Sequence, residues 1–248
     1  MQTARPFVIT IAGLDPSSGA GLSADLKTFE QNKVYGLSIC TGITTQTEKK
    51  FITVKWRTVE EVQSDLNILL NAYPIKAVKF GIIPDIHWLK ILCDMIKTHD
   101  SKIKIVVDPV IQSSTGFSFA DYGNKKLLYK IMPSLTLITP NAIEFEQLFG
   151  SEKNNLDWSV LNDCTVLLKG GHRNEKKGID TLFTKNETIE ILSSEKNIYA
   201  KHGSGCVLSS AITAELAKGI DIKTACEKAK IYTEHFLNSN STALGYHA

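Results

Sequence analysis

The residues best suited to chemistry lie near the C-terminal end, in Lys201-His202-Gly203-Ser204-Gly205-Cys206-Val207-Leu208. The stretch from Val207 to Lys218 is predicted to be a helix, so the Gly-Ser-Gly turn would open it. A helix start leaves several backbone N–H groups unpaired at one point, and such a point binds anions. Cys206 falls in the first turn, where the helix dipole favours a thiolate. The pattern predicts a phosphate site with a reactive sulfur; the alternative is a buried cysteine under a glycine-rich turn.

A second glycine-rich loop lies near the N-terminus. Phe7 to Ala12 is an apolar run typical of a buried strand, and Gly13 to Gly21 follows it with three glycines, two serines and a proline. A helix is predicted from there to about Gln31, with Asp25 in its first turn. A strand, a glycine-rich loop and a helix form a ligand-binding turn at the carboxyl edge of a sheet. The loop fits neither a Walker A motif nor a G-x-G-x-x-G fingerprint.

Polar residues also follow three other predicted strands. Asp108 comes after the strand 103–107, and Lys169 ends the strand 165–169 before two glycines. Asn141 and Glu144 follow the strand 135–138 as Asn-x-x-Glu at a helix start, which is also a capping box without chemistry. Lys169 could reach phosphate oxygens or extend along apolar surface to solvent. All of these side chains would meet at one sheet edge.

These elements need a scaffold, and the alternation of strands and helices supplies it. The sequence predicts a single α/β domain over residues 1–248, with three layers and a mostly parallel central sheet covered by helices on both faces. The segments 180–184 and 188–192 are predicted to form a hairpin. Residues 111–121 carry serine, threonine and glycine without periodicity, so we expect a mobile lid there. Further helices are predicted at 58–72, 86–97, 124–131, 142–149, 156–162 and 222–238, and further strands at 37–41, 51–56 and 77–80.

Composition excludes several function classes. The 248 residues are 43% hydrophobic and 22% charged, which is typical of a globular protein. A net charge of +2 argues against a nucleic-acid or membrane partner, and no apolar run is long enough to span a bilayer. Five widely spaced cysteines without a C-x-x-C pattern indicate free thiols, so we expect a cytoplasmic protein. The half-exposed strand 51–56 leaves room for a homodimer.

Taken together, the motifs resemble a known family. They are Ile11-Ala12-Gly13-x-Asp15-Pro16-Ser17-x-Gly19-Ala20-Gly21 with Ala24 to Phe29, Gln46, Lys79-Phe80-Gly81, Asp108-Pro109-Val110, Ile138 to Glu144, Lys169 to His172 and His202 to Ser209. In this order they are similar to hydroxymethylpyrimidine/phosphomethylpyrimidine kinases, the thiamine-pathway members of the ribokinase-like kinases. The resemblance covers nearly the whole chain. It implies a ribokinase-like fold and ATP- and Mg²⁺-dependent phosphorylation of the hydroxymethyl group of 4-amino-5-hydroxymethyl-2-methylpyrimidine and of its monophosphate.

The resemblance also implies roles for single residues. Gly203, Ser204 and Gly205 would form the anion hole for the transferred phosphoryl group, and Cys206 would accept the alcohol proton where most ribokinase-like kinases use an aspartate. The remaining roles concern substrate, nucleotide and metal. Substrate would be bound by Gly13, Ala20, Asp25, Gln46 and Val107, ATP by Asn141, Lys169 and Asp108, and Mg²⁺ by Glu144 and Asp108. For Asp25 the alternative is an acidic residue in the first turn of the helix, where the helix dipole stabilises its negative charge.

The chain departs from the family pattern at several positions. Ile82 stands where methionine is common, Ser18 where glycine is common, and Ser204 keeps the hydroxyl of a threonine. The segment 113–116 lacks the lysine that the family's lid often carries. Two alternatives stay open: a pyridoxal or pyridoxine kinase, and a non-catalytic pyrimidine-binding protein. The lid has no cysteine of the kind that related pyridoxal kinases use, and a binder would need no anion hole.

Overall fold

The first strand of the chain, β1 (Phe7–Leu14), lies inside the sheet between β2 and β4 and is an apolar run buried on both faces. The computed structural model describes residues 4–112, 119, 124–150, 164–171, 178–194 and 198–248. Most of the predicted lid at 111–121 and the helix predicted at 156–162 lie outside these residues.

Nine strands form one sheet over the described residues, in the order β3-β2-β1-β4-β5-β6-β7-β8-β9. The six neighbouring strands β2, β1, β4, β5, β6 and β7 run parallel to one another. At one edge β3 pairs antiparallel with β2, and at the other β8 pairs antiparallel with both β7 and β9. The mostly parallel centre and the β8–β9 hairpin confirm the prediction. The other strands are β2 (Tyr35–Gln46), β3 (Phe51–Trp56), β4 (Ile75–Phe80), β5 (Lys104–Val107), β6 (Leu137–Ile138), β7 (Thr165–Leu168), β8 (Asp180–Phe183) and β9 (Thr188–Ile191).

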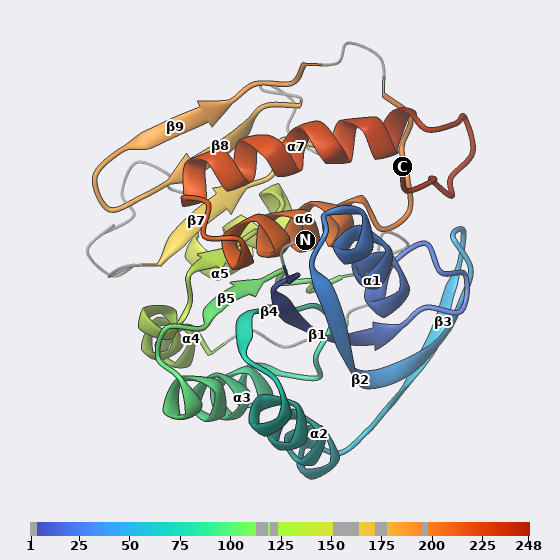
Figure 1. Ribbon diagram of the computed structural model, residues 1–248. Helices are drawn as coiled ribbons and strands as arrows, with labels where there is room; N and C mark the ends of the chain where they lie inside the picture. Colours follow the sequence, from blue (N-terminus) through green and yellow to red (C-terminus); the bar gives the residue numbers. More distant parts are fainter. Residues whose placement is uncertain (1–3, 113–118, 120–123, 151–163, 172–177, 195–197) are drawn as a thin grey trace.

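Helices cover both faces of the sheet (Figure 1). Alternate side chains of the strands enter different cores: Ile9 and Val78 pack with α2 to α5, whereas Val8 and Val106 pack under α1, α6 and α7. This alternation follows from the period of two in a strand. The first group comprises α2 (Val59–Ala72), α3 (Ile86–His99), α4 (Lys125–Ile131) and α5 (Ala142–Phe149); the second comprises α1 (Gly21–Gln31), α6 (Ser204–Ala217) and α7 (Ile222–Asn238).

Local capping explains where several helices begin. Thr58 and Glu61 form the predicted capping box of α2, and Asp85 accepts hydrogen bonds from the first amides of α3. The strand β2 continues to Gln46, beyond the predicted end at Thr41, because its second half pairs with β3. Among the described residues, no helix has both the length and the apolar character needed to cross a bilayer.

Candidate functional site

A cavity of about 940 Å³ lies where the loops that follow the parallel strands meet the start of α6. Parallel strands deliver their following loops to one edge, so residues far apart in the chain line the same space. Of the predicted site residues, the lining contains Gly13, Ala20, Gln46, Asp108, Asn141, Glu144, Lys169, Gly203, Ser204, Gly205 and Cys206.

The turn before α6 has the geometry of an anion cradle. The helix begins at Ser204, three residues earlier than predicted, because Gly203 takes a left-handed conformation with φ 78° and acts as the N-cap. The Gly203 carbonyl accepts its first hydrogen bond from the Val207 amide, at 3.0 Å. The amides of Ser204, Gly205 and Cys206 therefore precede the first intrahelical bond and are available to an anion.

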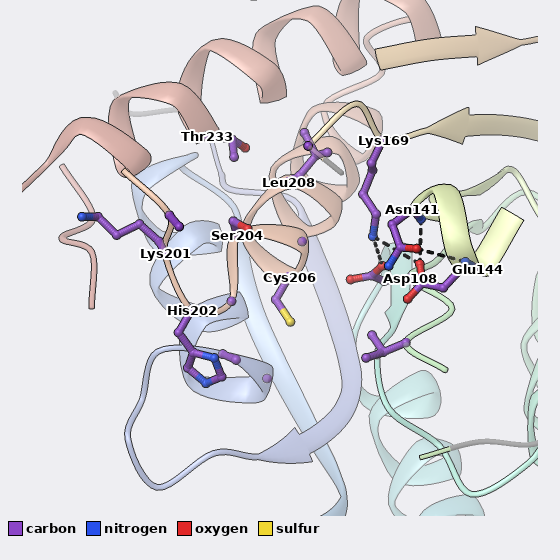
Figure 2. A pocket seen from close by; sticks show the side chains of 18 of the residues that line it. Asp108, Asn141, Glu144, Lys169, Lys201, His202, Ser204, Cys206, Leu208 and Thr233 are labelled. Atoms are coloured by element: carbon purple, nitrogen blue, oxygen red, sulfur yellow. Dashed lines mark hydrogen bonds and ion pairs between the residues drawn. The ribbon is translucent and has the colours of Figure 1, made fainter. Parts of the chain in front are cut away.

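Cys206 projects its sulfur from this first turn into the pocket (Figure 2). The sulfur accepts a hydrogen bond from the Gly21 amide, the first residue of α1, so two helix starts meet at one atom. Burial nevertheless raises the pKa of the Cys206 thiol to about 11. The charge of Lys79 lowers this pKa, whereas the charges of Asp25 and Asp108 raise it further. Desolvation therefore opposes the thiolate that the position at the start of the helix was expected to favour.

A lysine and two carboxylates form the opposite wall (Figure 2). The Lys169 Nζ lies 2.8 Å from Asp108 Oδ1 and 3.8 Å from Glu144 Oε2. Burial alone would lower the pKa of Lys169, but these two carboxylates raise it, so the lysine stays charged. A Cβ at Gly205 would lie 3.4 Å from both Asp108 Oδ2 and Lys169 Nζ. The anion cradle therefore borders directly on this cluster.

Glu144 is held by its neighbours as well as exposed to the pocket. The Asn141 amide donates to Glu144 Oε2 at 2.7 Å, and the Glu144 amide donates to Asn141 Oδ1 at 3.0 Å. The capping box is thus present, and it orients the carboxylate rather than removing it from the pocket. Burial and the nearby charge of Asp108 raise the pKa of Glu144, while Lys169 lowers it.

The donor set decides which kind of magnesium site could form. Within the described part of the chain, no three histidine, cysteine or acidic side chains gather as a metal cluster. Asp108 and Glu144 supply two carboxylates at the cavity wall. Mg²⁺ usually binds through one or two carboxylates with water and phosphate oxygens. The residues present therefore fit a hydrated Mg²⁺ that bridges to phosphates, and not a site made by protein ligands alone.

Two predicted substrate residues are not in the pocket. Asp25 is fully buried in the second turn of α1, where its carboxylate accepts hydrogen bonds from Thr10 Oγ1 at 2.6 Å, Lys79 Nζ at 2.6 Å and Ser210 Oγ at 2.7 Å. These donors belong to the protein, so Asp25 does not face a ring. Val107 is also fully buried, in the core beneath α2 to α5, and its side chain is not part of the pocket lining.

The structure shows side-chain pairings that the sequence motifs did not indicate. Asp15 and His202 line the pocket as a hydrogen-bonded pair, with 2.9 Å between Asp15 Oδ2 and His202 Nε2. At the far end, Lys230 Nζ lies 2.9 Å from Asp180 Oδ2 and 3.9 Å from Glu234 Oε1. This Glu234 oxygen is buried and has no hydrogen-bond partner within the described residues. The i,i+4 spacing of Lys230 and Glu234 in the sequence could have indicated their contact. No sequence pattern indicates the contact between Asp15 and His202, which are 187 positions apart.

Comparison with known proteins gives a consistent result. A sequence profile described as phosphomethylpyrimidine kinase matches residues 15–248. The hydroxymethylpyrimidine/phosphomethylpyrimidine kinase of Aquifex aeolicus is 31% identical over an alignment of 252 positions, which covers 97% of this chain and 98% of the relative.

Two solved structures show the same architecture. The phosphomethylpyrimidine kinase from Clostridium difficile 630 is 33% identical with a TM-score of 0.75, covering 92% of this chain and 98% of the other. The pyridoxal kinase from Staphylococcus aureus in complex with AMP-PCP and pyridoxal is 26% identical with a TM-score of 0.80, covering 98% and 92%. The fold is therefore ribokinase-like, as the resemblance implied. With the full-length match, this places the chain in the phosphomethylpyrimidine kinase family, and the protein is a phosphotransferase.

Proposed function

We propose that this chain transfers the γ-phosphoryl group of ATP to the hydroxymethyl group of 4-amino-5-hydroxymethyl-2-methylpyrimidine, and then to its monophosphate, in thiamine biosynthesis. The observation that supports this most is the junction at the start of α6. There the free amides of residues 204–206 and the Cys206 sulfur face the Lys169–Asp108–Glu144 cluster across one cavity. The Aquifex aeolicus relative is named a hydroxymethylpyrimidine/phosphomethylpyrimidine kinase, which also supports the proposal.

In the proposed reaction, the substrate hydroxyl oxygen forms a bond to the γ-phosphorus while the bond from this phosphorus to the bridging oxygen of ADP breaks. The hydroxyl proton moves to the Cys206 thiolate. Charge on the equatorial oxygens of the loose transition state is stabilised by the amides of Ser204, Gly205 and Cys206. Because burial keeps most of the thiol protonated near neutral pH, the thiolate is the minor, competent form.

The nucleotide side is assigned from the cluster at the other wall. Lys169 would contact the phosphates as a point charge, with Asn141 beside it. Asp108 and Glu144 would hold a hydrated Mg²⁺, which neutralises phosphate charge when bound. The S. aureus pyridoxal kinase binds the ATP analogue AMP-PCP on the same fold, which supports ATP as the donor.

The substrate side is assigned to the loop 13–21 and to Gln46. Gln46 is half-buried at the end of β2, and its amide can pair with a ring nitrogen and an exocyclic amine. The backbone of Gly13 and Ala20 lines the same space. Asp25 has no part in this assignment.

A parallel assay tests the proposal and its runner-up. ADP release is measured with hydroxymethylpyrimidine, its monophosphate and pyridoxal, for the native chain and for Cys206→Ser. We expect turnover on the two pyrimidines and a large loss in the variant. A preference for pyridoxal would favour the alternative that the S. aureus neighbour supports, and no turnover on any of the three would favour a pyrimidine-binding protein.

The cellular setting is proposed from the cysteines. All five are unpaired, which fits a reducing compartment, and we place the protein in the cytoplasm. The edge strand β3, with Ile52 exposed, is the proposed surface for a homodimer. Light scattering of the native chain and of Ile52→Lys tests the dimer.

A further inference from the structure

The ring loop (residues 13–21) and the phosphate turn (residues 202–206) touch each other through the Asp15–His202 pair. His202 Nε2–H donates to Asp15 Oδ2 at 2.9 Å, and the exposed fractions of the two side chains are 11% and 1%. The residues are 187 positions apart in the chain. A hydrogen bond between side chains buried this deeply holds both groups in place, because breaking it would leave a buried polar atom without a partner.

The same carboxylate organises the ring loop itself. Asp15 accepts from the Ser17 amide at 2.8 Å, from the Ser17 hydroxyl at 2.8 Å and from the Ala20 amide at 2.9 Å. Burial alone would raise the pKa of Asp15, but the bonds from His202 and Ser17 hold it below its ordinary value. The carboxylate is therefore ionised, and it connects the loop's own amides to the histidine of the other turn.

The two backbones are also in steric contact beside this pair. A Cβ at Gly203 would lie 1.9 Å from the Gly19 carbonyl oxygen, and a Cβ at Gly19 would lie 2.7 Å from His202 Cδ2. No side chain separates the two segments at this point. A change in the position of one segment therefore moves the other.

The C-terminal segment 240–244 supports the turn from outside. The His202 amide donates to the Ala243 carbonyl at 2.9 Å, and the Lys201 ammonium donates to the Thr242 carbonyl at 2.6 Å. A Cβ at Gly19 would also lie 2.8 Å from Leu244 Cδ2. Three segments from the two ends of the chain thus meet at His202.

We propose that Asp15 and His202 are positioning residues, which fix the separation between the pyrimidine ring and the phosphate turn. The inference rests on the proposed function. The hydroxymethyl oxygen must lie in line with the γ-phosphorus, and a misplacement of about 1 Å can cost about 100-fold in rate. The pair touches no reacting atom in this assignment and acts through Ala20 on one side and Gly203 on the other.

Kinetics of three variants test the proposal. His202→Leu removes the donor, His202→Gln keeps one, and Asp15→Asn/His202→Leu removes both the donor and the charge of the carboxylate. We expect kcat for phosphoryl transfer to fall about 10- to 100-fold in His202→Leu, with KM for both substrates within about threefold. His202→Gln should recover most of kcat, and the double variant should be impaired at least as much as His202→Leu, because Asp15→Asn also removes an acceptor oxygen from the ring loop. Hydrolysis of ATP by water without pyrimidine should not fall.

The matched control is Asp65→Asn. It breaks an ion pair of similar length, 2.6 Å to Arg57, at a site outside the pocket lining. Its kcat should equal that of the native chain. If kcat of His202→Leu is also native, or if His202→Gln is as impaired as His202→Leu, the positioning role is overturned.

Amide exchange separates this inference from the proposed function. Hydrogen exchange of the Ala20 and position-202 amides, which are bonded to Asp15 and to the Ala243 carbonyl in the native chain, needs no substrate. It should speed up at least about tenfold in His202→Leu and remain native in Asp65→Asn. Unchanged exchange overturns the inference even if the native chain phosphorylates none of the three substrates. If His202→Leu does not fold, His202→Ala takes its place in both measurements.

Discussion

Two lysine–carboxylate pairs lie near Cys206, and they differ in whether a ligand in the pocket can contact them. Lys79 and Asp25 are sealed in the protein with no exposed side-chain surface, and their 2.6 Å contact is completed by Thr10 and Ser210. Lys169 and Asp108 are 2.8 Å apart, and both line the pocket with Glu144. The same residue types therefore serve two purposes, depending on whether the protein supplies all the partners.

The difference teaches where a buried charge is available to a ligand. The oxygens of Asp25 receive three hydrogen bonds from protein groups, so this acid ties α1, β1, β4 and α6 together. The second cluster has one cation for two carboxylates, which leaves acceptor capacity on the pocket side. Both pairs affect the pKa of Cys206, because Lys79 of the first pair lowers it and Asp108 of the second raises it.

The largest expected effect on kcat comes from removing the Cys206 sulfur, which lies near both lysine–carboxylate pairs. Cys206→Ala should lower kcat about 10²- to 10⁴-fold, because a proton acceptor contributes on that scale. The urea midpoint should change little, since alanine fits a position that is partly exposed to the cavity. ADP release measures the first and fluorescence-detected unfolding the second. Native kcat in this variant would remove the sulfur from the mechanism.

Breaking the sealed pair should cost stability rather than recognition. Asp25→Leu leaves the Lys79 ammonium buried without its partner, and we expect the free energy of unfolding to fall by about 3–5 kcal/mol. The double variant Asp25→Leu/Lys79→Met should recover most of that loss. Urea unfolding gives both values. A rise in the pyrimidine KM with normal stability would instead restore Asp25 as a ring contact.

The pH dependence tests the state of the sulfur. With a thiol pKa of about 11, log kcat should rise by about one unit per pH unit from pH 7 to 10 if the thiolate is the competent form. Cys206→Asp, whose side chain ionises at acidic pH, should show no such rise. A flat native profile above pH 8 would contradict the raised pKa.

The same thiol affects stability with a defined sign. Its pKa in the folded chain, about 11, lies above the ordinary value of 9.0, so its contribution is complete below pH 9 and is lost as pH rises to about 11. Cys206→Ser should therefore lose less stability than the native chain between pH 9 and 11, by thermal unfolding.

The smallest effect is expected at the pocket-facing pair. Lys169→Met should raise the KM for ATP about tenfold through loss of a phosphate contact, and should lower stability by less than Asp25→Leu does, because water can reach the remaining carboxylates. Steady-state kinetics and urea unfolding provide the comparison. Equal losses of stability in Lys169→Met and Asp25→Leu would contradict the difference between the sealed pair and the pocket-facing pair.

Much of the fold was predictable because the signals are local. The apolar run 7–12, the capping box at Thr58 and the hairpin pattern after Asp180 each depend on neighbours in the chain. The start of α6 was not predictable to the residue, because it depends on a positive φ at Gly203 beside the Gly19 carbonyl.

The site was predictable as a set of residue types but not as a set of contacts. The lining includes most residues that the motifs indicated. The exceptions have physical causes: the partners of Asp25 at Lys79 and Ser210 are 54 and 185 positions away, and nothing near Asp25 signals them. The raised pKa of Cys206 likewise depends on how deeply the surrounding chain buries the sulfur.

The contact between Leu244 and Gly19 has a consequence for the order in which the protein is made. The ring loop (residues 13–21) is synthesised long before the phosphate turn that it must meet (residues 202–206) and the segment that braces this turn (residues 240–244). A nascent chain can form β1 and its neighbours long before the two loops touch. The contact between the two loops can therefore be completed only after residues 240–244 are made, so a chain cut short before Asn240 would present an unbraced phosphate turn.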